Sequence, residues 1–220
     1  KKLISKITKK DVIFVLYIII VSVISYFHEY WRDETQAWLI AKDLSFVDII
    51  KQMQYEGHPA LWHLILAPFA KLGFPLCTLS IINLVIMILT VWLLLYKAKM
   101  DENLKILFVF TAPFLYFYPV IARCYSLVCL LVVLISILYE KRRQKPILLG
   151  ILLCLLTNTH IVIAAFSGMI FLMFYLKEII VNKNRDKKII IGAIIKCLGF
   201  ILLRFCFLKA SAKNLAKFFT

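Results

Sequence analysis

Long apolar runs separated by short polar segments are the main pattern along this chain. A helix that crosses a membrane needs about 20 mostly apolar residues, and fewer where its ends reach the headgroups. Seven segments fit this pattern and are predicted to be transmembrane helices: 11–27, 77–96, 104–119, 124–139, 146–157, 161–177 and 189–208. The pattern therefore predicts an all-α membrane protein, a polytopic bundle of about seven transmembrane helices.

The apolar segment 58–73 is ambiguous, because it is short and contains Pro59 and Pro68. If it crosses the membrane, the basic clusters at 97–99, 141–145 and 183–188 lie outside. If it does not cross, all three clusters lie inside together with the N-terminal lysines, as the positive-inside rule requires. We therefore expect 58–73 to be an interfacial or re-entrant helix. It would lie in one outer loop, 28–76, with the N-terminus of the chain in the cytoplasm.

Composition supports a membrane protein and argues against a nucleic-acid partner. The 220 residues are 63% hydrophobic, against roughly 45–50% in soluble proteins, so the excess apolar surface is expected to face membrane lipids. The net charge of +15 comes from Lys and Arg in short clusters rather than in a continuous basic stripe. The six cysteines form no CxxC pair, which favours buried side chains over a metal site or a disulfide framework.

The two ends of the chain shape the expected domain organisation. The N-terminal basic stretch resembles a signal peptide, but no small-residue cleavage site follows the first apolar run, so an uncleaved first helix is expected. Residues 1–208 are predicted to form a single transmembrane module. Because the chain begins without Met and ends in a basic, apolar stretch, we expect residues 209–220 to begin a truncated outer segment of a longer protein.

Two neighbouring carboxylates, Asp33 and Glu34, directly follow the first predicted span. One interpretation is a solvated acidic turn between interfacial tryptophans, leading into an amphipathic surface helix. The other is a general base, since a carboxylate partly desolvated near lipid can accept a proton from an attacking alcohol. Neighbouring carboxylates also suit a divalent cation such as Mg²⁺ or Mn²⁺, but two of them do not make a metal site by themselves.

Histidines in the outer segments are the next candidates. His58 precedes a proline that fits the first turn of a helix, and it is either a hydrogen-bonded interfacial histidine or a functional one. Its five-residue spacing from His63 does not match the i, i+4 pair of a helical zinc site, so no metal site is predicted there. His160 lies in the polar segment 157–160, which is either a simple turn or part of the same outer cavity.

Arg123 lies in a very short outer turn between two apolar spans. An ionisable group at membrane depth costs at least ~2.5 kcal/mol on insertion scales and so indicates a site. Snorkelling to lipid phosphates is the alternative. A bound anionic ligand is favoured, because guanidinium binds phosphate in a bidentate manner. Arg204, near the outer end of the last span, suggests the same interaction.

Three short motifs resemble those of the GT-C membrane glycosyltransferases, above all the protein O-mannosyltransferase branch and its bacterial relatives, which include the aminoarabinose transferase of lipid A. They are Asp33-Glu34 after the first span, His58-Pro59-x-Leu61 in the outer loop, and Arg123-x-Tyr125-Ser126-Leu127. The segment 156–160 is also similar to a turn in bacterial members. The resemblance covers roughly residues 10–175. Ala60 stands where the family usually has a second proline.

The resemblance implies a bundle whose first outer loop forms juxtamembrane helices. It also implies inverting transfer of a mannose-like hexose from a polyprenyl-phosphate donor to a protein, lipid or glycan acceptor. The reaction would take place on the outer face of a membrane, which we expect to be the bacterial plasma membrane. Asp33 would be the base and Glu34 its acidic neighbour. The residues then expected to bind substrate are His58, Arg123, Tyr125, His160 and Arg204.

Two further interpretations remain open. A lipid-carrier flippase or transporter would need ionisable residues near the bilayer midplane, whereas the candidates above lie at the ends of the predicted spans. An inactive, truncated GT-C scaffold is the other, because family members continue through a further large outer loop and more spans.

Overall fold

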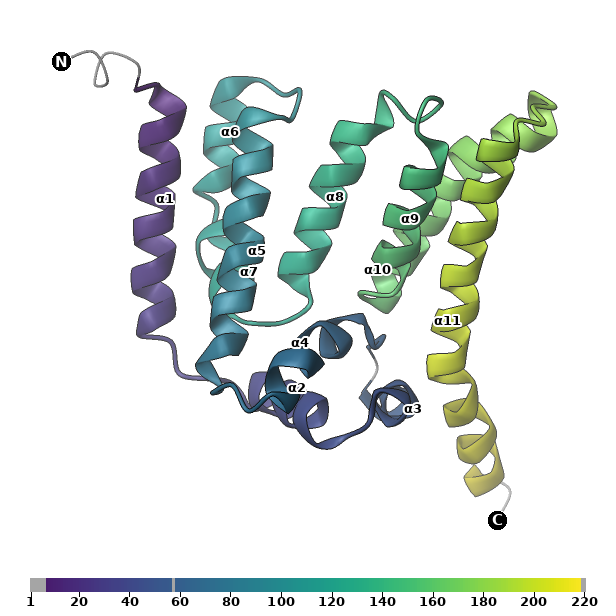
Figure 1. Cartoon of the computed structure of the whole chain (residues 1–220), viewed down its shortest axis with the longest axis horizontal. Coiled ribbons are helices and arrows are strands. Elements are labelled where there is room, and N and C mark those ends of the chain that lie inside the picture. Colours follow the sequence, from purple (N-terminus) through teal and green to yellow (C-terminus); the bar gives the residue numbers. More distant parts are fainter. Residues whose placement is uncertain (1–6, 57, 219–220) are drawn as a thin grey trace. The chain divides into compact units, whose positions relative to one another are not determined.

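The computed structural model describes residues 7–56 and 58–218 (Figure 1). Within these ranges the regular elements are helices and no strand occurs, which confirms the all-α prediction. The elements in chain order are α1 (Lys9–Tyr26), α2 (Arg32–Asp43), α3 (Phe46–Glu56), α4 (Leu61–Lys71), α5 (Cys77–Tyr96), α6 (Glu102–Val109), η2 (Pro113–Phe117), α7 (Tyr118–Val120), α8 (Tyr125–Tyr139), α9 (Pro146–Thr157), α10 (Ile161–Phe171), η3 (Leu172–Val181) and α11 (Lys187–Phe218).

The chain divides into two compact units. Unit 1 comprises Lys1–Gln36 and Phe74–Ile137, and unit 2 comprises Ala37–Gly73 and Leu138–Thr220. The first turn of α2 therefore belongs to unit 1, and the rest of that helix to unit 2. Residues 209–218, expected to begin an outer segment, continue α11.

Two helical segments among the described residues are long and apolar enough to cross a membrane: α5, with 20 residues, and the 21-residue stretch Ile161–Val181 formed by α10 and η3. A third candidate is the pair Glu102–Val109 and Pro113–Val120, which is bent by 56°. These lengths do not support the seven spans expected from hydropathy.

Length and charge explain the difference. The expected spans 124–139 and 146–157 form α8 and α9, with 15 and 12 residues. At 1.5 Å per residue they are about 22 and 18 Å long, which is less than the thickness of the hydrocarbon core of a bilayer, about 30 Å. The first three residues of α1 are charged. Segment 58–73 forms α4, whose 11 residues give about 16 Å.

Unit 1 is built on α1 and α5, which pack against each other. Thr8 and Asp11 form a capping box that starts α1, because each side chain accepts a hydrogen bond from the backbone of the other. The apolar core that α1 and α5 form with the end of α6 contains Ile13, Tyr17, Val21, Val91, Leu94, Leu95 and Val109. Asp11 accepts a hydrogen bond from Tyr96 at one end. Ser80 donates to Tyr30 at the other (3.1 Å), so the helices are antiparallel.

Charge is distributed unevenly between the two ends of unit 1. Lys9 and Lys10 begin α1, and Lys97 and Lys99 follow α5. Because α1 and α5 are antiparallel, these lysines share one end, where Lys10 also pairs with Glu102 (2.5 Å). The residues around Tyr30 and Ser80 share the other end. Unit 1 therefore has a basic end, and its opposite end carries the Asp33–Arg123 ion pair.

Unit 2 packs α9 against α10 and α11. The helices α9 and α11 approach closely at two glycines: a Cβ added to Gly150 would lie 2.3 Å from the Gly192 carbonyl oxygen. Small residues at such crossings allow helix backbones to approach closely. At the other end of α9, Asn158 Nδ2 donates to the Gly199 carbonyl (3.1 Å). These contacts hold α9 against α11, the helix that carries Lys196. His160 follows α9 and is the N-cap residue of α10.

Candidate functional site

The first turn of α2 carries two of the candidate residues, Asp33 and Glu34. Trp31 precedes the helix, and its backbone N–H donates to Glu34 Oε2 (2.8 Å). This is the acidic half of a capping box, in which the third helical residue satisfies an N–H that the helix leaves unpaired. The local sequence Trp-Arg-Asp-Glu therefore turns the chain into α2 and brings Glu34 back over its start.

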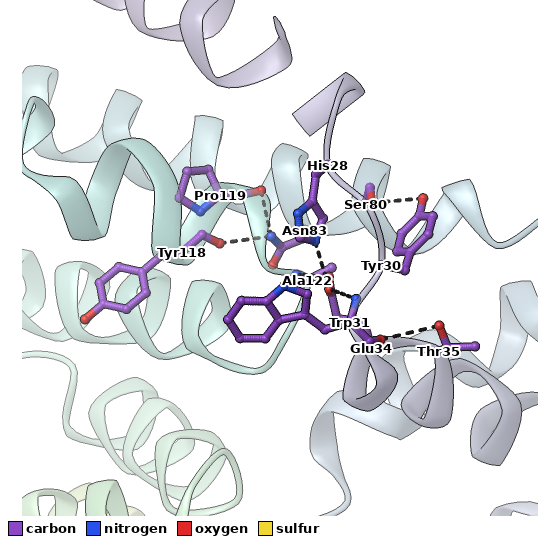
Figure 2. A network of polar contacts seen from close by, with 10 residues as sticks. All are labelled: His28, Tyr30, Trp31, Glu34, Thr35, Ser80, Asn83, Tyr118, Pro119 and Ala122. Atoms are coloured by element: carbon purple, nitrogen blue, oxygen red, sulfur yellow. Dashed lines mark hydrogen bonds and ion pairs between the residues drawn. The ribbon is translucent and has the colours of Figure 1, made fainter. Parts of the chain in front are cut away.

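Glu34 is fully buried, and its side chain joins three segments of unit 1 (Figure 2). His28 Nε2 lies 2.8 Å from Oε2, which also accepts from Trp31. The backbone N–H of Ala122 donates to Oε1 (2.6 Å). A carboxylate buried without partners would be strongly unfavourable; here both oxygens have partners. Glu34 therefore ties the segment after α1 to the turn before Arg123.

Asp33 has the opposite environment. Its side chain is 53% exposed, and Oδ2 accepts from Arg123 Nη1 (2.5 Å), whose side chain is 23% exposed. Consecutive helical residues point about 100° apart, so Glu34 faces inward while Asp33 faces solvent. We call Asp33, Glu34 and Arg123 the carboxylate–arginine site. The structure thus brings together three of the residues that the sequence singled out.

The segment that carries Arg123 is held from two sides. Asn83 on α5 is buried, and its Nδ2 donates to the carbonyl oxygens of Tyr118 (2.9 Å) and Pro119 (2.8 Å), as Figure 2 shows. Glu34 holds the next part of the same segment through Ala122. The Arg123 side chain therefore starts from a fixed backbone. Tyr125 begins α8 nearby, with its ring centroid 6.2 Å from that of Tyr118.

An open cavity of about 490 Å³ lies beside the carboxylate–arginine site. Its walls combine apolar and polar side chains from the end of α1, the following loop and η2: Val23, Ile24, Phe27, His28, Glu29, Trp31 and Tyr116. His28 both lines this cavity and contacts Glu34. A ligand in the cavity would therefore lie one side chain away from the buried carboxylate.

The remaining predicted residues belong to unit 2. The rings of His58 and His160 have centroids 5.0 Å apart. His160 caps α10, where its Nδ1 accepts from the backbone N–H of Val162 (3.3 Å). Arg204 is an exposed residue of α11. The predicted residues therefore fall into two groups, each within its own unit.

Groups that could hold a metal ion are not found among the described residues, where no three His, Cys, Asp or Glu side chains cluster suitably. Asp33 has a guanidinium as its partner, which repels a cation. All six cysteines are free thiols.

Sequence reasoning missed three residues that the structure singles out. His28 and Asn83 hold the site, yet each has only a weak signal: His28 ends the first apolar run, and Asn83 is a lone amide within one. Lys196 is fully buried in α11, where its Nζ donates to Thr157 Oγ1 and lies 3.7 Å from the centroid of the Phe200 ring. Its signal was a single lysine inside an apolar run.

Comparison of the chain with family models, curated proteins and solved structures finds no match. The function must therefore be inferred from the chemistry of the two groups of residues.

Replacing Glu34 by Gln tests the buried carboxylate. An amide has one acceptor oxygen, so either Ala122 N–H or the pair of donors at Oε2 loses its acceptor. We expect the free energy of unfolding to fall by about 1–3 kcal/mol, measured by thermal unfolding in detergent. Glu29→Gln, the same change at an exposed position, is the control. Equal melting temperatures for the two variants would contradict the anchoring role of Glu34.

Proposed function

We propose that this chain is a membrane glycosyltransferase module that moves a mannose-like hexose from a polyprenyl-phosphate donor to an acceptor hydroxyl. The observation that carries the proposal is the pairing of Asp33 with Arg123 at 2.5 Å, beside a carboxylate that fixes both segments. A solvent-facing carboxylate and a guanidinium are the two groups this transfer needs: a proton acceptor and a partner for phosphate. The sequence resemblance to GT-C transferases supports the same assignment.

The proposed step assigns a role to each group. The acceptor hydroxyl attacks the anomeric carbon of the donor, and Asp33 takes its proton. The bond between that carbon and the phosphate oxygen breaks, and its electron pair leaves with polyprenyl phosphate. Arg123 stabilises the negative charge on this phosphate. Glu34 touches no reacting atom in this scheme and acts as a positioning residue.

The distribution of charge in unit 1 supports a site on the outer face. The lysines that begin α1 and follow α5 share the end opposite Asp33 and Arg123. By the positive-inside rule such an end faces the cytoplasm. This supports an N-terminus inside and an acceptor outside. In this proposal the membrane is a bacterial plasma membrane.

The other predicted residues have supporting roles in the proposal. Tyr125 lies close to Arg123 in the chain and would contact the donor. His58 and His160 form an imidazole pair in unit 2, suited to hydrogen bonding with sugar or acceptor hydroxyls, and exposed Arg204 suits a second anionic contact.

A lipid-carrier flippase or transporter is a second candidate, and Lys196 is the observation that favours it. An ionisable residue buried between membrane helices is a functional candidate by default. Lys196 donates to the Thr157 hydroxyl, whose Oγ1 lies 3.0 Å from Ser167 Oγ. No carboxylate partner of Lys196 is found among the contacts of the described residues.

The transferase proposal predicts that Asp33→Asn abolishes transfer. Asparagine keeps the shape of the side chain but cannot take the hydroxyl proton, so the rate should fall by about 10²-fold or more. The assay would use proteoliposomes, a labelled mannosyl polyprenyl phosphate and an envelope extract as acceptor. Asp43→Asn, the same change at the exposed end of α2, should keep the wild-type rate. Wild-type turnover in Asp33→Asn would rule out the base assignment.

Replacing Lys196 by Met separates the two candidate functions. Methionine fills a similar volume without charge, and such replacements of buried ionic groups are often neutral for stability. The transferase proposal predicts unchanged transfer, whereas a transporter that depends on Lys196 would lose movement of a fluorescent isoprenyl phosphate across vesicle membranes. Lys187→Met, at the exposed start of α11, is the control. The transporter would be favoured if the wild type and Lys187→Met move the isoprenyl phosphate across the membrane and Lys196→Met does not.

A further inference from the structure

The Asp33–Arg123 pair cannot act in the proposed reaction while it stays closed. In an inverting displacement the attacking hydroxyl and the leaving phosphate lie on opposite faces of the anomeric carbon. Reacting atoms approach to about 3–3.5 Å, so the base and the phosphate-binding group must stand on either side of the sugar. In the structure Asp33 Oδ2 and Arg123 Nη1 are in direct contact at 2.5 Å. The pair must therefore open during the reaction.

We propose that a phosphate ligand opens this pair by replacing the Asp33 carboxylate at the Arg123 guanidinium. The ligand class is an isoprenyl phosphate, and the inference rests on the proposed function above. In the resting site the base and the arginine neutralise each other. When the phosphate arrives, it binds the guanidinium in place of Asp33. The Asp33 carboxylate is then available to accept the proton of the acceptor hydroxyl. The base is thus set free only when a donor is bound.

The contrast between the two carboxylates shows which one can move. Glu34 is fully buried and has partners at both oxygens, so its displacement would leave buried donors unsatisfied. Asp33 is 53% exposed, and water can solvate its carboxylate once it leaves Arg123. An exposed ion pair contributes little to stability. Asp33 can therefore detach without disturbing the anchor formed by its neighbour.

The arginine, in contrast, stays in place when the pair opens. Its backbone follows Ala122, which Glu34 holds, and the segment before it is held by Asn83. A guanidinium offers a planar fork that matches two phosphate oxygens, and the Asp33 carboxylate contacts this fork at Nη1. Phosphate can therefore compete with the Asp33 carboxylate for Nη1 of Arg123.

Binding of farnesyl phosphate to the full chain in nanodiscs tests this competition by titration calorimetry. Asp33→Asn removes the competing charge and should bind at least fivefold more tightly than wild type. Arg123→Gln should bind at least tenfold more weakly, and adding Asp33→Asn to it should restore nothing. Asp43→Asn should match wild type. Farnesol, which lacks the phosphate, should show no difference between wild type and Asp33→Asn.

The outcomes separate this inference from the proposed function. Wild-type or weaker affinity of Asp33→Asn for farnesyl phosphate overturns the competition, even if the same variant has lost sugar transfer. Tighter binding by Asp33→Asn supports the competition, even if no hexose donor is used by the wild type. A melting temperature for Asp33→Asn close to that of wild type confirms that affinity is compared between folded proteins.

Discussion

Burial of the Glu34 carboxylate is the interaction on which unit 1 depends. A carboxylate with no access to water must find its partners within the protein, and Glu34 finds them in three segments: at His28, at Trp31 and at Ala122. The segment after α1, the start of α2 and the turn before α8 are therefore held together by one side chain. Because neighbouring residues of a helix point in different directions, Asp33 is directed outward, toward Arg123.

Much of this arrangement could be predicted from the sequence, for physical reasons. Apolar runs indicate helices, and the basic clusters between them indicate which loops share a side, so Asp33 and Arg123 were expected to lie together. His28, Asn83 and Lys196 could not be found in this way, because hydropathy treats a polar residue in an apolar run as a tolerated exception. The seven spans were not supported, because hydropathy does not show where a helix ends or bends. The turn and bend between Val109 and Pro113 illustrate this.

The division of the site residues between two units has consequences for function. Unit 1 contains an acid, an arginine and an adjoining cavity, while unit 2 contains the imidazole pair and a buried lysine. The chemistry of unit 1 suits transfer from a phosphate-linked donor. The buried lysine of unit 2 has neighbours that are hydroxyl and aromatic, which suits a stable polar core as well as a transport role. The transferase proposal is therefore tested at Asp33 in unit 1, and the transporter alternative at Lys196 in unit 2.

Hydrogen exchange at the Ala122 amide tests the central claim most directly, because this N–H reports the contact that joins α2 to the turn before Arg123. We predict that, in the folded chain in nanodiscs, this amide exchanges as slowly as amides within α5, since it is buried and donates to Glu34 Oε1 (2.6 Å). Exchange as fast as in an exposed turn would contradict the account. The two segments would then not be joined, and Asp33 and Arg123 would have no common anchor.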